Sequence, residues 1–148
     1  MPKPITPLVG CDVFVPDETG ERVLLIRRSD NGFWALPGGC QDLGETPAEC
    51  ACRECAEETG YTVRPVRLLG VFSSRRYEFV HYPWKDNEFT HLLFLAAVVA
   101  GEARLSAETS EVAFFTENDL PPLSDGHAPR IAHGFRALRE SGLPPYFE

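Results

Sequence analysis

The sequence predicts one domain that mixes α-helices with β-strands, and three features support this. Its 148 residues are a usual length for a single domain, and 43% of them are hydrophobic, which suffices for a core. Short apolar runs bounded by turn residues alternate with two segments of helical character. Because no repeat, low-complexity tract or linker interrupts the chain, we expect residues 1–148 to form one domain.

The first 40 residues predict two strands joined by a turn. Leu8 to Val15 is apolar, Asp17 to Gly20 has turn chemistry, and Arg22 to Arg28 carries an apolar stretch between charges. This order predicts a β-hairpin. After a short loop, the run from Trp34 to Gly39 ends in two glycines, which let the backbone approach a ligand closely.

Four further elements are expected downstream. Strands are predicted from Val63 to Phe72, from Thr90 to Val99 and, shorter, from Val112 to Thr116. A loop or hairpin tip is predicted at 83–87, and a helix from about Ala128 to Glu140.

A helix with well-defined ends is predicted between the two groups of strands. Thr46 supplies a capping hydroxyl, Pro47 occupies the first helical position, and Glu49 completes a capping box. Gly60 is expected to end the helix. Alanine and cysteine residues occupy the faces away from its acidic side chains, so this helix can pack closely against a sheet.

Three glutamates, Glu54, Glu57 and Glu58, share one face of this helix. At about 100° per residue they fall within roughly a 100° arc. Like charges four residues apart, such as Glu54 and Glu58, destabilise a helix by about 0.2 to 0.5 kcal/mol, and a divalent cation would reverse that effect. Arg53 lies four residues from Glu49 and from Glu57, so it can orient carboxylates. The pattern predicts a cation site.

The acidic helix belongs to a longer segment in which glycine, glutamate and arginine recur at fixed spacings. The order is Gly39, five residues, Glu45, seven residues, and then Arg53-Glu54-Cys55-Ala56-Glu57-Glu58-Thr59-Gly60-Tyr61. The chain therefore resembles the Nudix hydrolases over the whole Nudix box of that family, and its strand pattern extends the resemblance over most of its length. Cys55 and Tyr61 depart from the usual residue types, but neither is a ligand position. The resemblance implies an α+β Nudix fold, a mixed β-sheet sandwiched between α-helices.

The resemblance also implies a cofactor and a set of site residues. It implies hydrolysis of a nucleoside diphosphate derivative with Mg²⁺ or Mn²⁺. The implied metal ligands are the Gly39 carbonyl and the carboxylates of Glu54, Glu57 and Glu58. The implied catalytic residues are Arg53 in an orienting role, Glu54 as a ligand or general base, and Glu57. Glu45 is expected to hold Arg53 or a bridging water, and not to bind the metal directly.

One more acid is expected from outside the box, because many family members add one from a loop near the end of the sheet. Glu111, directly before the strand predicted from Val112, is our choice as a catalytic residue, and Glu108 is the alternative. A carboxylate from a second element would assist a water molecule held between the ion and phosphorus.

Substrate-binding residues are predicted less specifically. Arg28 is a candidate for binding phosphate, and Tyr77, similar in its spacing to a tyrosine of diadenosine polyphosphate hydrolases, is a candidate for stacking on a base. Further candidates are Phe33, Tyr82 and Trp84 for stacking and Arg75 and Arg76 for phosphate. The four histidines receive no catalytic role.

The resemblance leaves several functions open. A MutT-like pyrophosphohydrolase of nucleoside triphosphates, including deoxynucleotides, is the first choice. Dinucleoside polyphosphates, nucleotide sugars and ADP-ribose are alternative substrates. A non-catalytic module that senses a nucleotide is an alternative of another class. The complete set of box glutamates favours the enzyme.

Composition restricts the partners and the compartment. A net charge of −8 argues against a protein that binds duplex nucleic acid, whereas a small nucleotide can be neutralised by cations. Five cysteines, an odd number with no secretory signal before them, predict a cytoplasmic protein. No segment approaches the roughly 20 apolar residues that cross a membrane, so no membrane partner is expected. A homodimer is an assembly that the sequence allows.

Overall fold

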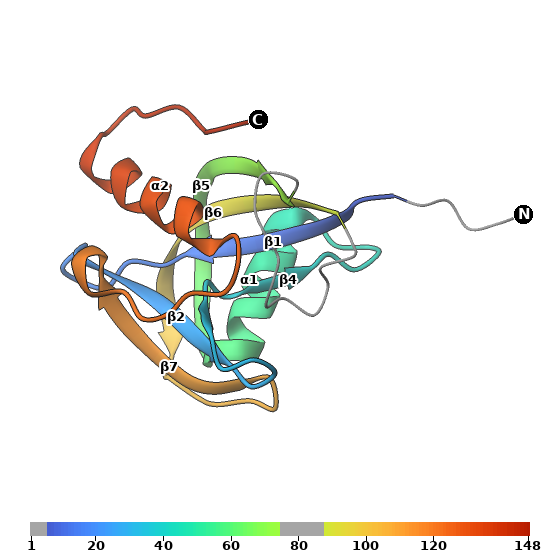
Figure 1. Cartoon of the computed structure of the whole chain (residues 1–148), viewed down its shortest axis with the longest axis vertical. Coiled ribbons are helices and arrows are strands. Elements are labelled where there is room, and N and C mark those ends of the chain that lie inside the picture. The colour runs from blue at the N-terminus through green and yellow to red at the C-terminus, as the bar shows by residue number, and fades with distance from the viewer. Residues whose placement is uncertain (1–5, 75–87) are drawn as a thin grey trace, which may run out of the picture.

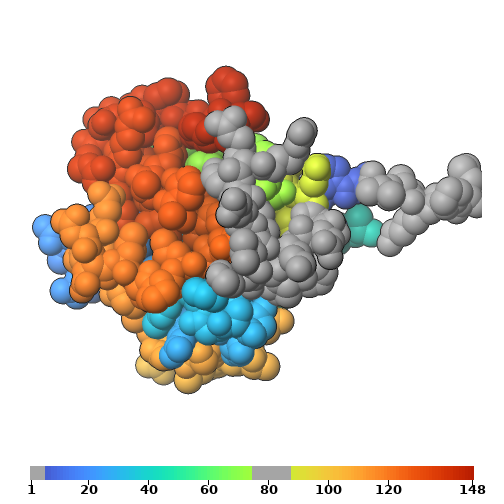
Figure 2. All heavy atoms as spheres, viewed as in Figure 1, coloured from blue at the N-terminus to red at the C-terminus, as the bar shows by residue number. Residues whose placement is uncertain are grey.

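The computed structural model describes residues 6–74 and 88–148 and arranges them as two sheets with two helices (Figure 1). The strands are β1 (Leu8–Phe14), β2 (Arg22–Arg28), β3 (Trp34–Ala35), β4 (Gly38–Cys40), β5 (Tyr61–Ser73), β6 (Phe89–Gly101) and β7 (Thr109–Thr116). The helices are α1 (Pro47–Thr59) and α2 (His127–Arg139), and a short 3₁₀ helix spans Glu117–Asp119. Helix α2 and the C-terminal residues form much of one end of the visible surface (Figure 2).

The two sheets differ in the order and the direction of their strands. The larger has the strand order β4-β1-β6-β5, in which β1 and β6 are parallel and the other pairs antiparallel. The smaller has the order β3-β2-β7 and is antiparallel throughout.

Strand β1 is buried on both faces and separates two hydrophobic clusters. Cys11 and Val13 belong to a cluster that contains Cys50 and Cys55 of α1. Phe14, on the other face, belongs to a cluster with residues of α2 and packs edge-to-face on Phe135, with ring centroids 5.1 Å apart. The helices thus cover opposite faces of a mixed sheet, which confirms the expected α+β arrangement.

Helix α1 has both of the ends that the sequence predicts. The Thr46 side chain accepts a hydrogen bond from the Glu49 amide at 3.2 Å, and the Glu49 carboxylate accepts one from the Thr46 amide at 3.1 Å. Gly60 follows the helix with a φ of 84°, a conformation that favours glycine.

The predicted β-hairpin is wrong, because β1 and β2 do not pair as neighbouring strands of one sheet. The turn itself forms, since Gly20 has a φ of 74° and its amide donates to the Asp17 carbonyl. Pro16 and Val23, on the two sides of the turn, form one isolated β-bridge. Farther from the turn, β1 and β2 separate into different sheets. The reason is that β1, buried on both faces, takes an inner position between β4 and β6.

The structure also adds or extends strands that position the site. Gly38–Cys40 forms β4 beside β1, although two glycines give little local strand signal. Strand β7 begins at Thr109, earlier than the expected Val112. The described part of the chain contains no helix long and apolar enough to cross a membrane.

Candidate active site

A cavity of about 630 Å³ opens between α1, β4 and the loops that flank β2 and β7. Its lining residues are Arg28, Ser29, Asp30, Gly38, Gly39, Cys40, Glu54, Glu58, Ala107 and Glu108. A cavity of this size can enclose much of a nucleotide. Two of the three clustered helix acids therefore lie on one concave surface, together with an acid from a distant loop.

Glu58 is held at the back of this cavity by the backbone of β4. Its side chain is buried, and its Oε1 accepts a hydrogen bond from the Gly38 amide at 2.8 Å. Burial raises the pKa of Glu58 well above its usual value, and the nearby carboxylates of Glu54, Asp12 and Glu108 add to the rise. A positive charge at this point would be strongly stabilised.

Gly39 provides room for the carboxylate of Glu54. A Cβ atom at residue 39 would lie 2.5 Å from Cδ of Glu54 and 2.6 Å from its Oε1. No larger residue fits there, so the Glu54 carboxylate lies directly against the β4 backbone. Burial raises the pKa of Glu54, and Arg53 opposes this rise.

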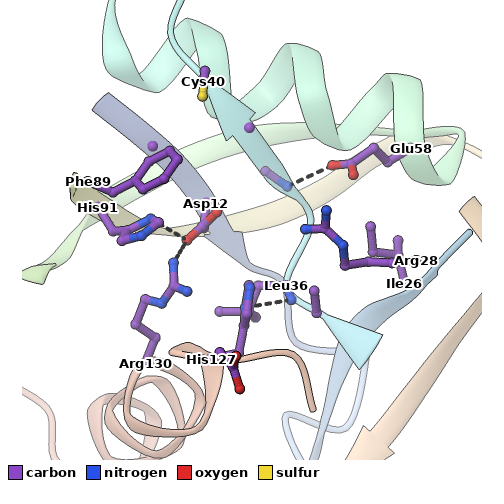
Figure 3. A pocket seen from close by; sticks show the side chains of 15 residues that line it. Asp12, Ile26, Arg28, Leu36, Cys40, Glu58, Phe89, His91, His127 and Arg130 are labelled. Atoms are coloured by element: carbon purple, nitrogen blue, oxygen red, sulfur yellow. Dashed lines mark hydrogen bonds and ion pairs between the residues drawn. The ribbon is translucent and has the colours of Figure 1, made fainter. Parts of the chain in front are cut away.

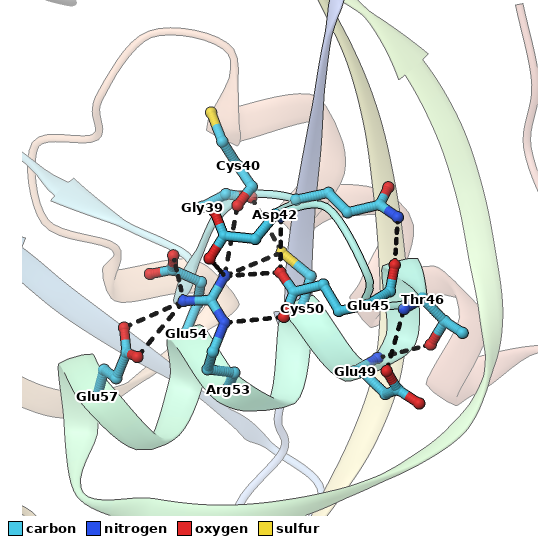
Figure 4. A network of polar contacts seen from close by, with 11 residues as sticks. Gly39, Cys40, Asp42, Glu45, Thr46, Glu49, Cys50, Arg53, Glu54 and Glu57 are labelled. Carbon is cyan, nitrogen blue, oxygen red and sulfur yellow. Dashed lines mark hydrogen bonds and ion pairs between the residues drawn. The ribbon is translucent and has the colours of Figure 1, made fainter.

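Arg53 connects the acids of α1 with the loop before the helix (Figure 4). Its Nε and Nη2 atoms donate to the two carboxylate oxygens of Glu45 at 2.9 and 2.7 Å, a bidentate pair. Its Nη1 atom donates to Glu54 at 3.0 Å and to Glu57 at 3.3 Å. The hydrogen bonds from Arg53 lower the pKa of Glu45 to about 2. Glu45 thus contacts Arg53 as the resemblance implied.

The residues present fit a divalent cation of the hard, oxygen-binding kind. In the part of the chain that the structure describes, no three His, Cys, Asp or Glu side chains are already gathered as ligands. Glu54 and Glu58 nevertheless face one cavity, and both have raised pKa values that a cation would lower. Glu57, whose side chain is 58% exposed, contacts Arg53 instead and is not among the lining residues.

The acid expected from outside the box is placed differently from the expectation. Glu111 lies within β7, opposite Arg27 of β2, and its Oε1 is 2.8 Å from Nη1 of Arg27. Among the described residues, the cavity lining includes Glu108 and does not include Glu111. The structure thus places Glu108, the alternative, on this cavity, whereas Glu111 lies in the strand beside it. The reason is the early start of β7, which places Glu111 in the paired part of the strand.

Arg28 lies at the rim of the cavity and is held by an acid. Its Nε and Nη2 atoms donate to Oδ1 and Oδ2 of Asp30 at 2.9 and 2.5 Å. This bidentate pair lowers the pKa of Asp30. The candidates Arg75, Arg76, Tyr77, Tyr82 and Trp84, and the loop tip expected at 83–87, lie outside the residues that the structure describes.

A second, smaller cavity contains polar residues that the sequence did not assign (Figure 3). Arg130 of α2 donates through Nη1 to Oδ2 of Asp12 in β1, and His127 accepts from the Leu36 amide at 3.1 Å. His91 of β6 lies beside Asp12. The signal that could have identified them is polarity in an apolar context, since Asp12 stands between Cys11 and Val13.

Comparison with known proteins agrees with the box. The family model of the NUDIX domain matches residues 6–138. YjhB of Bacillus subtilis (strain 168), provisionally named an ADP-ribose pyrophosphatase, is 35% identical over 103 residues, which are 70% of this chain and 48% of that protein. The ADP-ribose pyrophosphatase of Methanocaldococcus jannaschii is 36% identical over 126 residues, which are 82% of this chain and 69% of the relative.

Two further similarities extend over nearly the whole chain. A Bacillus subtilis (strain 168) protein provisionally named 8-oxo-dGTP diphosphatase is 31% identical, with coverage of 90% of this chain and 89% of the relative. The crystal structure of a UDP-X diphosphatase superimposes with a TM-score of 0.84 at 26% identity, covering 99% of this chain and 70% of that one. The chain spans about half the length of YjhB.

Proposed function

The chain belongs to the Nudix family, and we propose that it hydrolyses the diphosphate linkage of a nucleoside diphosphate derivative with Mg²⁺ or Mn²⁺. The observation that carries this proposal is the convergence of Glu54, Glu58 and Glu108 on one cavity beside Gly39. A bound diphosphate is negatively charged, and the carboxylates that line the site are negatively charged as well. Only a cation between them makes binding favourable.

Each side chain of the site has a role in the proposed reaction. Glu54 and Glu58, with the Gly39 carbonyl, would bind the divalent cation, and Glu57 remains a predicted ligand. When bound, the cation would neutralise phosphate oxygens and make a water molecule more acidic. The Gly38 amide fixes the carboxylate of Glu58, so this ligand is oriented before substrate arrives.

Arg53 and Glu108 complete the proposed machinery. Arg53, anchored on Glu45, positions Glu54 through a hydrogen bond and acts as a positioning residue. Glu108 approaches the cavity from the loop before β7, on another side from α1. A carboxylate there would accept the proton of the attacking water. Glu108 accordingly replaces Glu111 in the proposal.

Arg28 is proposed to bind a phosphate oxygen of the substrate. It lines the same cavity as the acids and lies in a bidentate pair with Asp30. Because phosphate offers the same fork of oxygens as a carboxylate, a substrate can compete with Asp30 for this guanidinium.

ADP-ribose is the first substrate to test, and nucleoside triphosphates are the second. The Methanocaldococcus jannaschii relative, 36% identical, is named an ADP-ribose pyrophosphatase, which supports the former. The relative provisionally named 8-oxo-dGTP diphosphatase matches over 90% of this chain, which supports the latter. The two classes give different products, so one panel distinguishes them.

The test is a panel of ADP-ribose, nucleotide sugars, dinucleoside polyphosphates and (deoxy)nucleoside triphosphates with Mg²⁺. Released nucleoside monophosphate, pyrophosphate, phosphate and sugar phosphate are measured separately. We expect turnover of at least one class, and a loss of about 100-fold or more in kcat for Glu58→Gln, because an amide is a poor ligand for a hard cation.

Glu21→Gln, which removes an exposed acid away from the cavity, is the matched control and should keep full activity. Circular dichroism verifies that both variants are folded. If the protein binds nucleotides but hydrolyses none of the panel, the enzyme assignment is wrong and the nucleotide-sensing alternative holds.

A further inference from the structure

The smaller cavity, which we call the histidine cavity, adjoins the candidate active site. Its volume is about 40 Å³. It shares Arg28, Gly38, Gly39, Cys40 and Glu58 with the larger cavity, and its remaining walls come from β1, β2, β6 and the start of α2. A substrate held by the acids of α1 would therefore lie next to it.

His91 is the unexplained residue of this cavity. It is 6% exposed, and neither Nδ1 nor Nε2 has a hydrogen-bond partner among the described residues. The nearest acidic oxygen, Oδ2 of Asp12, is 3.8 Å from Nδ1, too far for a hydrogen bond. Buried polar atoms are almost always paired in folded proteins, so two orphaned nitrogens on one ring indicate a missing ligand or water.

The fold provides space for this ring at a specific point of the sheet. His91 is in register with Gly10 across the parallel ladder of β1 and β6. A Cβ atom at residue 10 would lie 2.6 Å from Nδ1 of His91, so only glycine leaves room for the imidazole there. The Phe89 ring stacks on the imidazole, with ring centroids 5.3 Å apart and planes 15° apart. The ring is thus fixed against two neighbours, as a recognition element requires.

The surroundings make His91 a neutral ligand. Burial, together with the charge of Arg130, lowers the pKa of His91 to about 2. Arg130 is itself paired with Asp12, so the two formal charges beside the ring compensate each other (Figure 3). A neutral imidazole presents one N–H donor and one nitrogen acceptor. It therefore suits an uncharged group better than a phosphate.

The size of the cavity restricts what enters it. About 40 Å³ accommodates water or a single polar substituent, but not a purine or pyrimidine ring. We propose that His91 is a specificity-determining residue that hydrogen-bonds one neutral polar substituent on the nucleoside part of the substrate. That substituent belongs either to the edge of the base or to the ribose as a hydroxyl. This inference rests on the proposed function, because it assumes a nucleotide in the adjoining site.

The test measures binding without turnover, so it is readable even if no panel substrate is hydrolysed. Isothermal titration is performed with AMP, GMP, CMP and UMP and with their 2′-deoxy forms. The wild-type protein should distinguish the bases, or the ribose from the deoxyribose, by about tenfold in Kd. The first pattern assigns the substituent to the base and the second to the sugar.

Two variants perturb the ring from opposite sides. His91→Leu removes both nitrogens, and Gly10→Ala displaces the ring, so each should reduce the wild-type discrimination by about five- to tenfold. Thr90→Val, at the position directly before His91 in β6, is the control and should leave the discrimination unchanged. If His91→Leu does not fold, Gly10→Ala and the polar variant His91→Asn are compared with the wild type instead.

If the wild type, His91→Leu and Gly10→Ala distinguish the nucleotides equally well, the proposal is overturned. The histidine cavity would then be a structural cavity that holds water. A wild-type protein that binds all eight nucleotides equally would overturn it as well. In contrast, loss of turnover with intact discrimination would contradict the proposed hydrolysis and not the role of His91.

Discussion

Arg27 and Glu111 face each other across the ladder of β2 and β7, with Nη1 of Arg27 2.8 Å from Oε1 of Glu111. Both side chains are about half exposed, so the pair is solvated and contributes little to stability. The contact nevertheless directs the carboxylate of Glu111 toward β2. It leaves Glu108, in the preceding loop, as the acid that reaches the cavity.

Glu108→Gln should therefore slow turnover more than Glu111→Gln does. We expect kcat to fall by about 10²- to 10⁴-fold for Glu108→Gln, the usual range for a general base, and to change by less than about threefold for Glu111→Gln. Steady-state kinetics with the best substrate of the panel measures both. A large loss confined to Glu111→Gln would reinstate the acid that the sequence suggested.

Arg53→Lys should lower kcat while leaving the domain folded. Lysine keeps the positive charge but cannot bind Glu45 with two nitrogens and reach Glu54 at once. The expected loss is about 10- to 100-fold, because Glu54 then loses its fixed orientation. Kinetics and a thermal melt are recorded together. Arg64→Lys, an exposed arginine of β5, is the control. Full activity of Arg53→Lys would show that charge alone suffices.

Chelation should abolish activity without unfolding the domain. Helix α1 is capped at both ends, and its inner face belongs to a cluster of buried residues that includes no proposed ligand. The fold therefore does not depend on the ion. The far-ultraviolet circular dichroism spectrum in excess EDTA should match that of the untreated protein, and added Mg²⁺ should raise the Tm. A spectrum of an unfolded chain in EDTA would contradict this.

The contribution of the two buried histidines to stability should decrease below about pH 6.5. His91 and His127 are buried, and burial, with the nearby charge of Arg130, lowers the pKa of each. The folded-state pKa of His91 is about 2, whereas an unfolded histidine has a pKa of about 6.5. Below about pH 6.5 the unfolded chain thus binds more protons. The stabilisation is complete above that pH and is lost progressively as the pH falls.

Urea unfolding at several values between about pH 7.5 and about pH 5 measures this effect. The free energy of unfolding should fall by up to about 1.4 kcal/mol per pH unit for each of the two histidines. His91→Leu removes one of these contributions, so the free energy of unfolding of the variant should fall less steeply with decreasing pH than that of the wild type. An equal slope in the variant would mean that His91 is protonated in the folded protein.

The parts of the fold that the sequence predicted are those with local signals. Helix α1 is determined by a cap, a proline and a glycine that lie within its own segment, and its bounds agree with the expectation. Pairing is not local. The turn at Asp17 suggested a hairpin, but β1 is buried on both faces, and that burial places it between β4 and β6.

The same distinction applies to the site. Glu54 and Glu58 share a helix face, so their spacing alone brings them together. The choice between Glu108 and Glu111 depended on where β7 begins, which its pairing with β2 decides. Asp12 had a local signal, a polar residue in an apolar run, but its contacts with His91 and Arg130 could not be predicted because the three residues lie on elements far apart in the chain.

Successive side chains of β1 point to opposite faces of the sheet, and this separates two sets of residues that can mutate in different ways. Cys11 and Val13 pack toward the helix that carries the acids, whereas Asp12 points toward the opposite helix and the histidine cavity. Mutations on β6 or α2 can therefore alter which nucleoside is accepted without disturbing the carboxylates of α1. Substrate preference and bond cleavage can therefore change through different side chains of this scaffold, with Glu58 bordering both cavities.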